Sequence, residues 1–240
     1  MNYVIANWKS NITTAQDAQL LATHIVSLAT HESVAWCICP ATEHIAQVAS
    51  VLAGSRVLLG AQDIDMEVGV DQLTSLGVSY VIVGHSDRRW KLGESEEVVA
   101  RKLRAVLASG MTPVLCVGER TSDEDRDAVV DAQLASAVGD LSQQERSACL
   151  VAYEPVWAIS TSDNARPDTP ERASTVARHI QEVWGPKAVL YGGSVSPETM
   201  GGFWSAPAIE GVLVGKASTI PASLERFQGI ISTSSPHANN

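Results

Sequence analysis

The sequence predicts an α/β protein whose parallel strands close into a single (β/α)8 barrel. Eight short apolar segments alternate along the chain with eight segments of helical pattern. The short segments are apolar throughout, as expected for strands that are buried on both faces of a parallel sheet. The length of 240 residues is typical of one such barrel. A doubly wound sheet fits less well, because eight units fill a barrel once and leave none over.

The predicted strands are the apolar runs themselves. In chain order they are residues 3–7, 34–39, 56–61, 80–83, 112–116, 150–153, 188–191 and 211–214. The four cysteines lie in these runs or directly beside one, at Cys37, Cys39, Cys116 and Cys149. Their spacing is not that of metal ligands, so we expect reduced core residues and no metal site.

The predicted helices lie between and after the strands. In chain order they are residues 14–30, 42–52, 70–76, 94–109, 123–138, 169–183, 197–204 and 221–230. The clearest start is Thr169-Pro170-Glu171, which combines an N-cap, a proline at the first helical position and an acidic first turn. No charge run or Ser/Gly-rich linker divides the units, so we expect one barrel domain over residues 1–231. Residues 232–240 are polar and predict a flexible tail.

The composition limits the function. A net charge of -10 argues against a protein that binds nucleic acid or a membrane surface. It is compatible with an anionic substrate, because phosphate sites can be built from backbone N–H groups. No apolar stretch reaches ~18 residues, and no basic segment precedes an apolar one at the N-terminus. We therefore expect no membrane span and no secretory signal, and a cytoplasmic location.

The carboxyl ends of barrel strands carry the chemistry in this fold. The polar or small segments at these ends are residues 7–9, 84–89, 116–119, 154, 192–194 and 215–218. They place a carboxylate, a histidine, a lysine and two small-residue turns on one rim. This set predicts proton abstraction next to a carbonyl in a substrate that carries a phosphate.

Glu154 is the predicted base. It ends an apolar run, and Pro155 biases it away from helical backbone. Trp157 then gives an apolar anchor to a small-residue stretch, residues 160–162, which predicts a mobile cover beside the base. A glutamate that ends a strand by chance is the alternative for this residue taken alone.

These motifs resemble those of triosephosphate isomerases. The chain has Asn-Trp-Lys at 7–9, Gly-His-Ser-Asp-Arg-Arg at 84–89, Cys-Val-Gly-Glu at 116–119, Ala-Tyr-Glu-Pro-Val-Trp-Ala-Ile at 152–159, Tyr-Gly-Gly-Ser at 191–194 and Leu-Val-Gly at 213–215. Six motifs in the family's order, between residue 2 and about 231, are specific where one alone is not. The resemblance implies a TIM barrel that interconverts D-glyceraldehyde 3-phosphate and dihydroxyacetone phosphate in glycolysis and gluconeogenesis, without cofactor or metal.

The resemblance also implies roles for single residues. Glu154 resembles the family's base, and His85 its neutral imidazole that polarises the carbonyl, a standard example of pKa tuning. Lys9 resembles the cation that attracts the substrate and stabilises enediolate charge. Asn7 would bind the substrate or position Lys9, and Asp87 would pair with Lys9.

The phosphate would be bound by backbone N–H groups. The resemblance places these groups at Ser194, Gly215 and Lys216, and in the cover near Ser160. Glu119 resembles the residue that holds the open cover, although an ordinary salt bridge explains it equally well.

The chain also departs from the family's pattern. The cover reads Ser160-Thr161-Ser162 where Gly-Thr-Gly is usual, Lys216 replaces a glycine, and Asp87 replaces a glutamate. After Gln62 the third loop is shorter by roughly eight residues and lacks its Thr-Gly-Glu element. We infer that the family's dimer is absent or rebuilt, which leaves open a monomer, a differently arranged dimer or a tetramer. The shorter loop should also loosen the hold on Lys9 and His85.

Two other functions stay open at the level of sequence. An isomerase of a longer sugar phosphate, such as a tetrulose phosphate, would use the altered cover and Lys216. A barrel that binds a phosphate or a partner protein without turnover would fit the shortened loop. It would leave Asn7, Lys9, His85 and Glu154 without a purpose.

Overall fold

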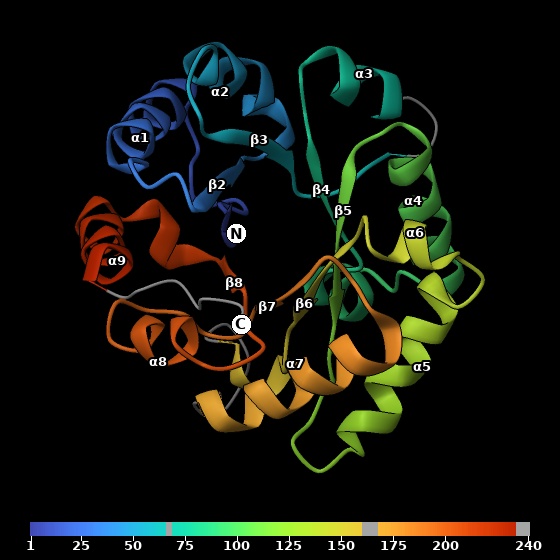
Figure 1. Cartoon of the computed structure of the whole chain (residues 1–240). Coiled ribbons are helices and arrows are strands. Elements are labelled where there is room, and N and C mark those ends of the chain that lie inside the picture. The colour runs from blue at the N-terminus through green and yellow to red at the C-terminus, as the bar shows by residue number, and fades with distance from the viewer. Residues whose placement is uncertain (66–68, 160–167, 234–240) are drawn as a thin grey trace.

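Eight parallel strands close into a barrel in the computed structural model, which describes residues 1–65, 69–159 and 168–233 (Figure 1). Each strand pairs with the next one along the chain, and β8 pairs with β1 to close the ring. The strands are β1 (Asn2–Asn7), β2 (Val34–Cys39), β3 (Leu58–Ala61), β4 (Tyr80–Val83), β5 (Thr112–Val117), β6 (Leu150–Tyr153), β7 (Ala188–Tyr191) and β8 (Gly211–Val214). The predicted (β/α)8 barrel is confirmed, and no strand end lies more than two residues from its predicted position.

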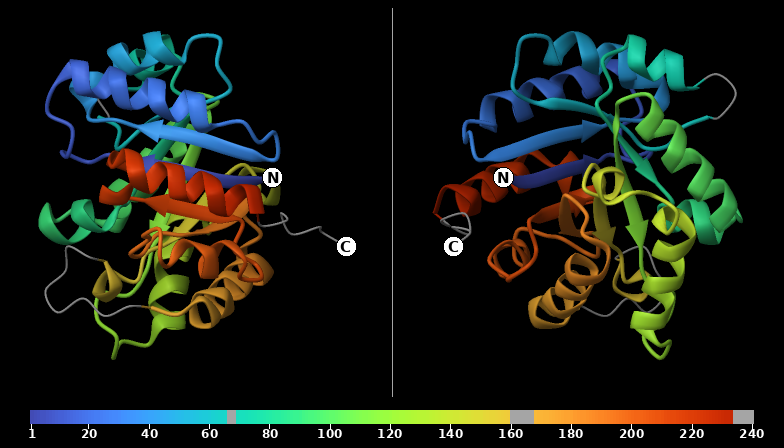
Figure 2. Two further views of the ribbon diagram at one scale, coloured as in Figure 1. Left: turned by 90° about the vertical axis from the view of Figure 1, so that its left-hand side faces the viewer. Right: turned by 45° about the vertical axis from the view of Figure 1, so that its right-hand side comes forward.

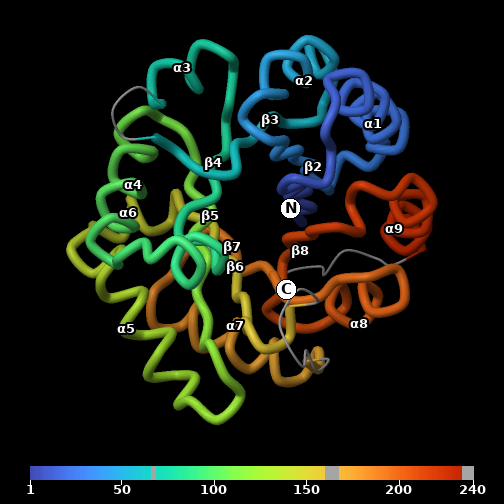
Figure 3. Tube along the Cα trace, turned by 180° about the vertical axis from the view of Figure 1, so that it is seen from behind, coloured from blue at the N-terminus to red at the C-terminus, as the bar shows by residue number. Residues whose placement is uncertain are grey.

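Helices form the outer layer of the barrel, as the view from behind also shows (Figure 3). They are α1 (Ala15–Leu28), α2 (Ile45–Leu52), α3 (Gly69–Ser75), α4 (Glu96–Ala108), α5 (Arg126–Val138), α6 (Gln143–Arg146), α7 (Pro170–Trp184), α8 (Met200–Trp204) and α9 (Pro221–Thr233). Neighbouring helices such as α1 and α9 run roughly along the strands on the outside (Figure 2). Among the described residues, none of these helices is long and apolar enough to cross a bilayer.

Helix ends follow the local sequence chemistry. The Thr169 side chain caps α7 by accepting from Arg172 N, with Pro170 at the first helical position as predicted. Helix α6 was not predicted, although its capping box, Ser142 with Glu145, is a recognisable signal. Helix α9 continues to Thr233, and the remainder of the predicted tail, residues 234–240, lies outside the described residues.

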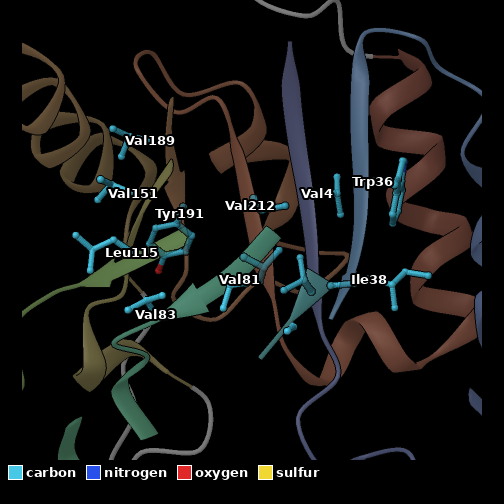
Figure 4. Close-up of a cluster of buried hydrophobic side chains, with 14 of the residues drawn as sticks. Val4, Trp36, Ile38, Val81, Val83, Leu115, Val151, Val189, Tyr191 and Val212 are labelled. Atoms are coloured by element: carbon cyan, nitrogen blue, oxygen red, sulfur yellow. The ribbon is translucent and has the colours of Figure 1, made fainter. Parts of the chain in front are cut away.

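The alternation of side chains along the strands divides the core into two parts. Ile5 and Cys37 belong to the cluster that fills the barrel, while Val4 and Trp36 belong to the larger cluster between strands and helices. Figure 4 shows members of this second cluster from most of the strands. Both faces of each strand are therefore buried, which explains why the strands are apolar throughout. All four cysteines are buried and free, as predicted.

Within the described parts of the chain, short helical turns follow strands at the rim: η1 (Thr42–His44), η2 (Asp87–Lys91), η3 (Val156–Ala158) and η4 (Lys216–Thr219). Strand register decides which rim residues become neighbours. Val117 pairs with Tyr153, and Tyr153 pairs with Tyr191. The residues that follow these strands therefore meet, and they include Glu154 and Gly192.

Candidate active site

Glu154 is held rigidly at the tip of β6. Its backbone N–H donates to Val117 O at 2.7 Å, and its side chain is buried. One carboxylate oxygen, Oε2, accepts from the backbone N–H of Ser86 at 3.1 Å, and the other lies 3.2 Å from His85 Nε2. A Cβ at position 192 would lie 2.7 Å from Glu154 Cγ, so the glycine there makes room for this side chain.

His85 follows β4 and Gly84, whose φ of +67° favours glycine and whose missing side chain leaves room for the Arg89 guanidinium. The backbone N–H of Asp87 donates to His85 Nδ1 at 3.1 Å, so this nitrogen carries no proton and Nε2 carries one. Burial lowers the pKa of His85, the Glu154 charge opposes this, and Lys9 lowers it further. The geometry thus holds a neutral imidazole with its N–H directed toward the base.

Lys9 adopts a left-handed backbone, with φ of 49°, directly after Asn7 and Trp8. Its backbone N–H donates to Asn7 Oδ1 at 3.2 Å, and its carbonyl accepts from Gln62 Nε2 at 3.0 Å. Its Nζ lies 2.9 Å from Asp87 Oδ2, so the shorter aspartate still forms the ion pair. A strained backbone held by two side chains, with the ammonium group paired by a third, is typical of a functional position. The sequence did not predict that Gln62 would bind the Lys9 carbonyl.

A cavity of about 530 Å³ connects these groups to the two small-residue turns. Asn7, Lys9, His85, Glu154, Ser194 and Lys216 are among its lining residues. Gly215 also lines it, and a Cβ there would lie 3.9 Å from Lys9 Cε. The backbone N–H of Ser194 donates to Ala158 O at 3.3 Å, so a phosphate would have to replace that carbonyl. Ser160 lies outside the described residues.

Glu119 is fully buried, and the structure gives it partners on two segments. It accepts from Trp157 Nε1 at 2.9 Å and from Tyr153 OH at 3.0 Å, which ties it to the segment after Glu154. It also accepts from Arg172 Nη2 at 3.1 Å, as a salt bridge. Sequence reasoning did not find Arg172 or its neighbour Asp168, whose carboxyl pKa burial raises to about 6.

The site therefore joins a buried carboxylate, a neutral imidazole and an ammonium group along one cavity. Such a set can take a proton from the carbon next to a carbonyl, return it to the carbonyl carbon, and stabilise the charge that develops on the oxygen. The barrel and this rim define the class of an enzyme that isomerises small phosphorylated sugars.

Comparison with known proteins gives the family. The family model for triosephosphate isomerase matches residues 2–234. A triosephosphate isomerase of Symbiobacterium thermophilum is 40% identical, with 92% of this chain and 93% of that protein covered. Those of Nitrosomonas europaea and Roseiflexus castenholzii are 36% and 35% identical, over 92% and 94% of this chain and 94% and 96% of theirs. The chain belongs to the triosephosphate isomerase family, and it is an isomerase.

Proposed function

We propose that the protein interconverts D-glyceraldehyde 3-phosphate and dihydroxyacetone phosphate in glycolysis and gluconeogenesis. The observation that carries this proposal is the pair formed by Glu154 and His85, at 3.2 Å, with the Lys9 ammonium on the same cavity. Family membership over nearly the whole chain supports it.

The proposed reaction moves one proton between two neighbouring carbons and one proton between their oxygens. Glu154 takes the proton from the carbon next to the carbonyl, and the electron pair moves onto the carbonyl oxygen. His85 Nε2–H and Lys9 stabilise the resulting enediolate. The hydroxyl proton on the adjacent carbon's oxygen then moves to the former carbonyl oxygen by way of His85. Glu154 returns a proton to the former carbonyl carbon, and a new carbonyl forms at the carbon that lost its proton. No electrons leave the substrate, so no cofactor is needed. Asn7 positions Lys9 through its side-chain oxygen.

The phosphate group is proposed to bind in the same cavity, at the turns that follow β7 and β8. Gly215 and Lys216 lie where η4 begins, and Ser194 follows β7. Backbone N–H groups in such turns bind anions closely. The side chain of Lys216 would add a positive charge there, since it is exposed on the cavity wall. Ser160 would add a contact from the cover.

We also propose a cytoplasmic location and a homo-oligomer with a non-standard interface. Four buried, free thiols fit a reducing compartment. The Lys9 carbonyl is held by Gln62 of the same chain, so a contact from a partner is not needed at this atom.

The test is an activity assay with the purified protein on trioses and tetruloses that carry a phosphate. We expect turnover of glyceraldehyde 3-phosphate in the range common for enzymes, about 1–1000 per second. The kcat/KM for a tetrulose phosphate should be at least about tenfold lower. The reverse preference would assign the longer sugar, and a folded protein without turnover of either would leave a binding role.

A further inference from the structure

A second lysine shares the carboxylate that pairs with Lys9. Lys91 ends the turn η2, and its Nζ lies 2.5 Å from Asp87 Oδ1. Lys9 Nζ lies 2.9 Å from the other oxygen, Oδ2. Asp87 thus holds two ammonium groups, one on each oxygen, and all three side chains line the substrate cavity.

The two lysines also determine the charge state of Asp87. Burial raises the pKa of the Asp87 carboxyl, but hydrogen bonds from Lys91 and Lys9 outweigh it and lower the pKa to about 2. Asp87 therefore stays ionised and carries one negative charge against two positive ones. Lys91 also contributes to the lowered pKa of His85.

The proposed mechanism leaves Lys91 without a role. An exposed ion pair between residues four apart usually stabilises a protein only slightly. Here, however, the partner is the carboxylate that orients the proposed substrate-binding lysine. Without Lys91, the Asp87 carboxylate could turn and present both oxygens to Lys9, which would neutralise it more completely.

We propose that Lys91 is a positioning residue for Lys9 in the isomerase reaction. By holding Asp87 Oδ1, it leaves Lys9 a single carboxylate oxygen, so that Lys9 retains positive charge toward the anionic substrate. This inference rests on the proposed function and extends it to substrate affinity. Lys91 pairs with Asp87, and its effect is exerted through that carboxylate.

The test compares three variants of the whole protein in the isomerase assay. Lys91→Met should raise KM for dihydroxyacetone phosphate about fivefold at low salt and leave kcat within about twofold. The rise should shrink to less than about twofold at 0.5 M salt, because exposed charges are screened. Lys91→Arg should restore the low KM.

Lys187→Met is the matched control, because it removes the same charge far from the site. Lys187 is exposed just before β7 begins, at the opposite end of the barrel, with its Nζ 5.9 Å from the Tyr3 ring centroid. It should leave KM unchanged. An unchanged KM in Lys91→Met, or an equal rise in Lys187→Met, would overturn the proposal.

Binding of glycerol 3-phosphate separates this proposal from the proposed function. This monophosphate has no carbonyl, so its dissociation constant, measured by calorimetry, requires no turnover. Weaker binding to Lys91→Met by about fivefold, with the wild-type unfolding temperature, supports the role of Lys91 even if the wild-type protein isomerises no triose. Equal binding to both proteins, or binding to neither, contradicts it.

Discussion

At the scale of single residues, the surroundings of Glu154 and His85 give these two titratable groups different hydrogen-bonding roles. Glu154 receives a backbone N–H from Ser86 and stands beside the imidazole N–H, so it is ready to accept a proton. His85 accepts the backbone N–H of Asp87 on Nδ1, which leaves it only one proton to offer. These surroundings fit the proposed roles of Glu154 as base and of His85 as neutral hydrogen-bond donor.

We expect His85 to be neutral at pH 7, with its proton on Nε2. Burial lowers its pKa in the folded state below the unfolded value of about 6.5. The unfolded protein therefore binds the proton first as pH falls, and this histidine reduces stability below about pH 6.5. Nitrogen-15 NMR of the imidazole ring measures the state directly. A protonated Nδ1 at pH 7 would contradict it.

The sequence predicted the main groups of the site because each follows an apolar run and so falls on one rim. Asn7, Lys9, His85 and Glu154 line one cavity in the structure. Gln62 and Lys91 could not be predicted in the same way. Their contacts join segments whose approach depends on side-chain directions within the closed barrel, and no motif records those directions.

At the scale of elements, the buried guanidinium of Arg89 links the turn η2 by hydrogen bonds to the ends of two strands. Arg89 donates to the carbonyl of Gly84 and, at 2.5 Å, to that of Cys116. Its Nε and Nη2 also donate to the two oxygens of Glu96 at 2.7 and 2.9 Å. These bonds fix the turn that carries Asp87 relative to β4 and β5.

Arg89→Met should lower the free energy of unfolding by about 3 kcal/mol, because it leaves buried carbonyls and a carboxylate without their donor. Arg178→Met serves as the control, since Arg178 is exposed on α7 and should change stability by less than about 0.5 kcal/mol. Urea unfolding of the three proteins measures both values. Equal stabilities of the two variants would refute the role given to Arg89.

The connection between β6 and α7 contains a carboxyl group that its surroundings disfavour when ionised. Burial raises the pKa of Asp168 to about 6, against a hydrogen bond from the Thr169 backbone and the charge of Arg172. The unfolded value is about 3.9. Between these values the folded state binds more protons, so stability falls as pH rises from about 4 to about 6 and stays lower above that range.

Asp168→Asn should therefore be more stable than the wild-type protein by about 1 kcal/mol at pH 7.5 and no more stable at pH 4. Asp127→Asn is the opposite control. Arg126 lies 2.8 Å from Asp127, and its hydrogen bond lowers the pKa of that carboxyl. Removal of the Asp127 charge should therefore not stabilise the protein at pH 7.5. Urea unfolding midpoints of the wild-type protein and both variants, measured at pH 4 and pH 7.5, test this prediction. A higher stability of Asp168→Asn at pH 4 would contradict the explanation.

The elements themselves could be predicted better than their ends. Strands buried on both faces leave continuous apolar runs, so all eight lie where the sequence indicated. The single turn of α6 was missed because it buries no side chain and so leaves no apolar pattern. The predicted helix at residues 197–204 is shorter in the structure, where α8 begins at Met200.

At the scale of the whole molecule, the short third loop leads us to expect an assembly that does not use residues 63–75. Charge reversal of the exposed Asp71 on α3 should then leave the native mass and the activity unchanged. Asp140→Lys, between α5 and α6, is the matched control. Sedimentation of the wild-type protein and both variants measures the mass. Dissociation of Asp71→Lys alone would show that the interface includes this segment.

The central claim also concerns the whole molecule. It is that the closed barrel brings Glu154 to the substrate as the base that transfers the proton. The most direct measurement is isomerisation in deuterium oxide, with NMR of the product and with Glu154→Gln in parallel. We expect deuterium on the carbon that receives the proton, and a loss of rate in the variant of at least about 100-fold with its fold intact. Product without any deuterium, or a variant as fast as the wild-type protein, would contradict the claim.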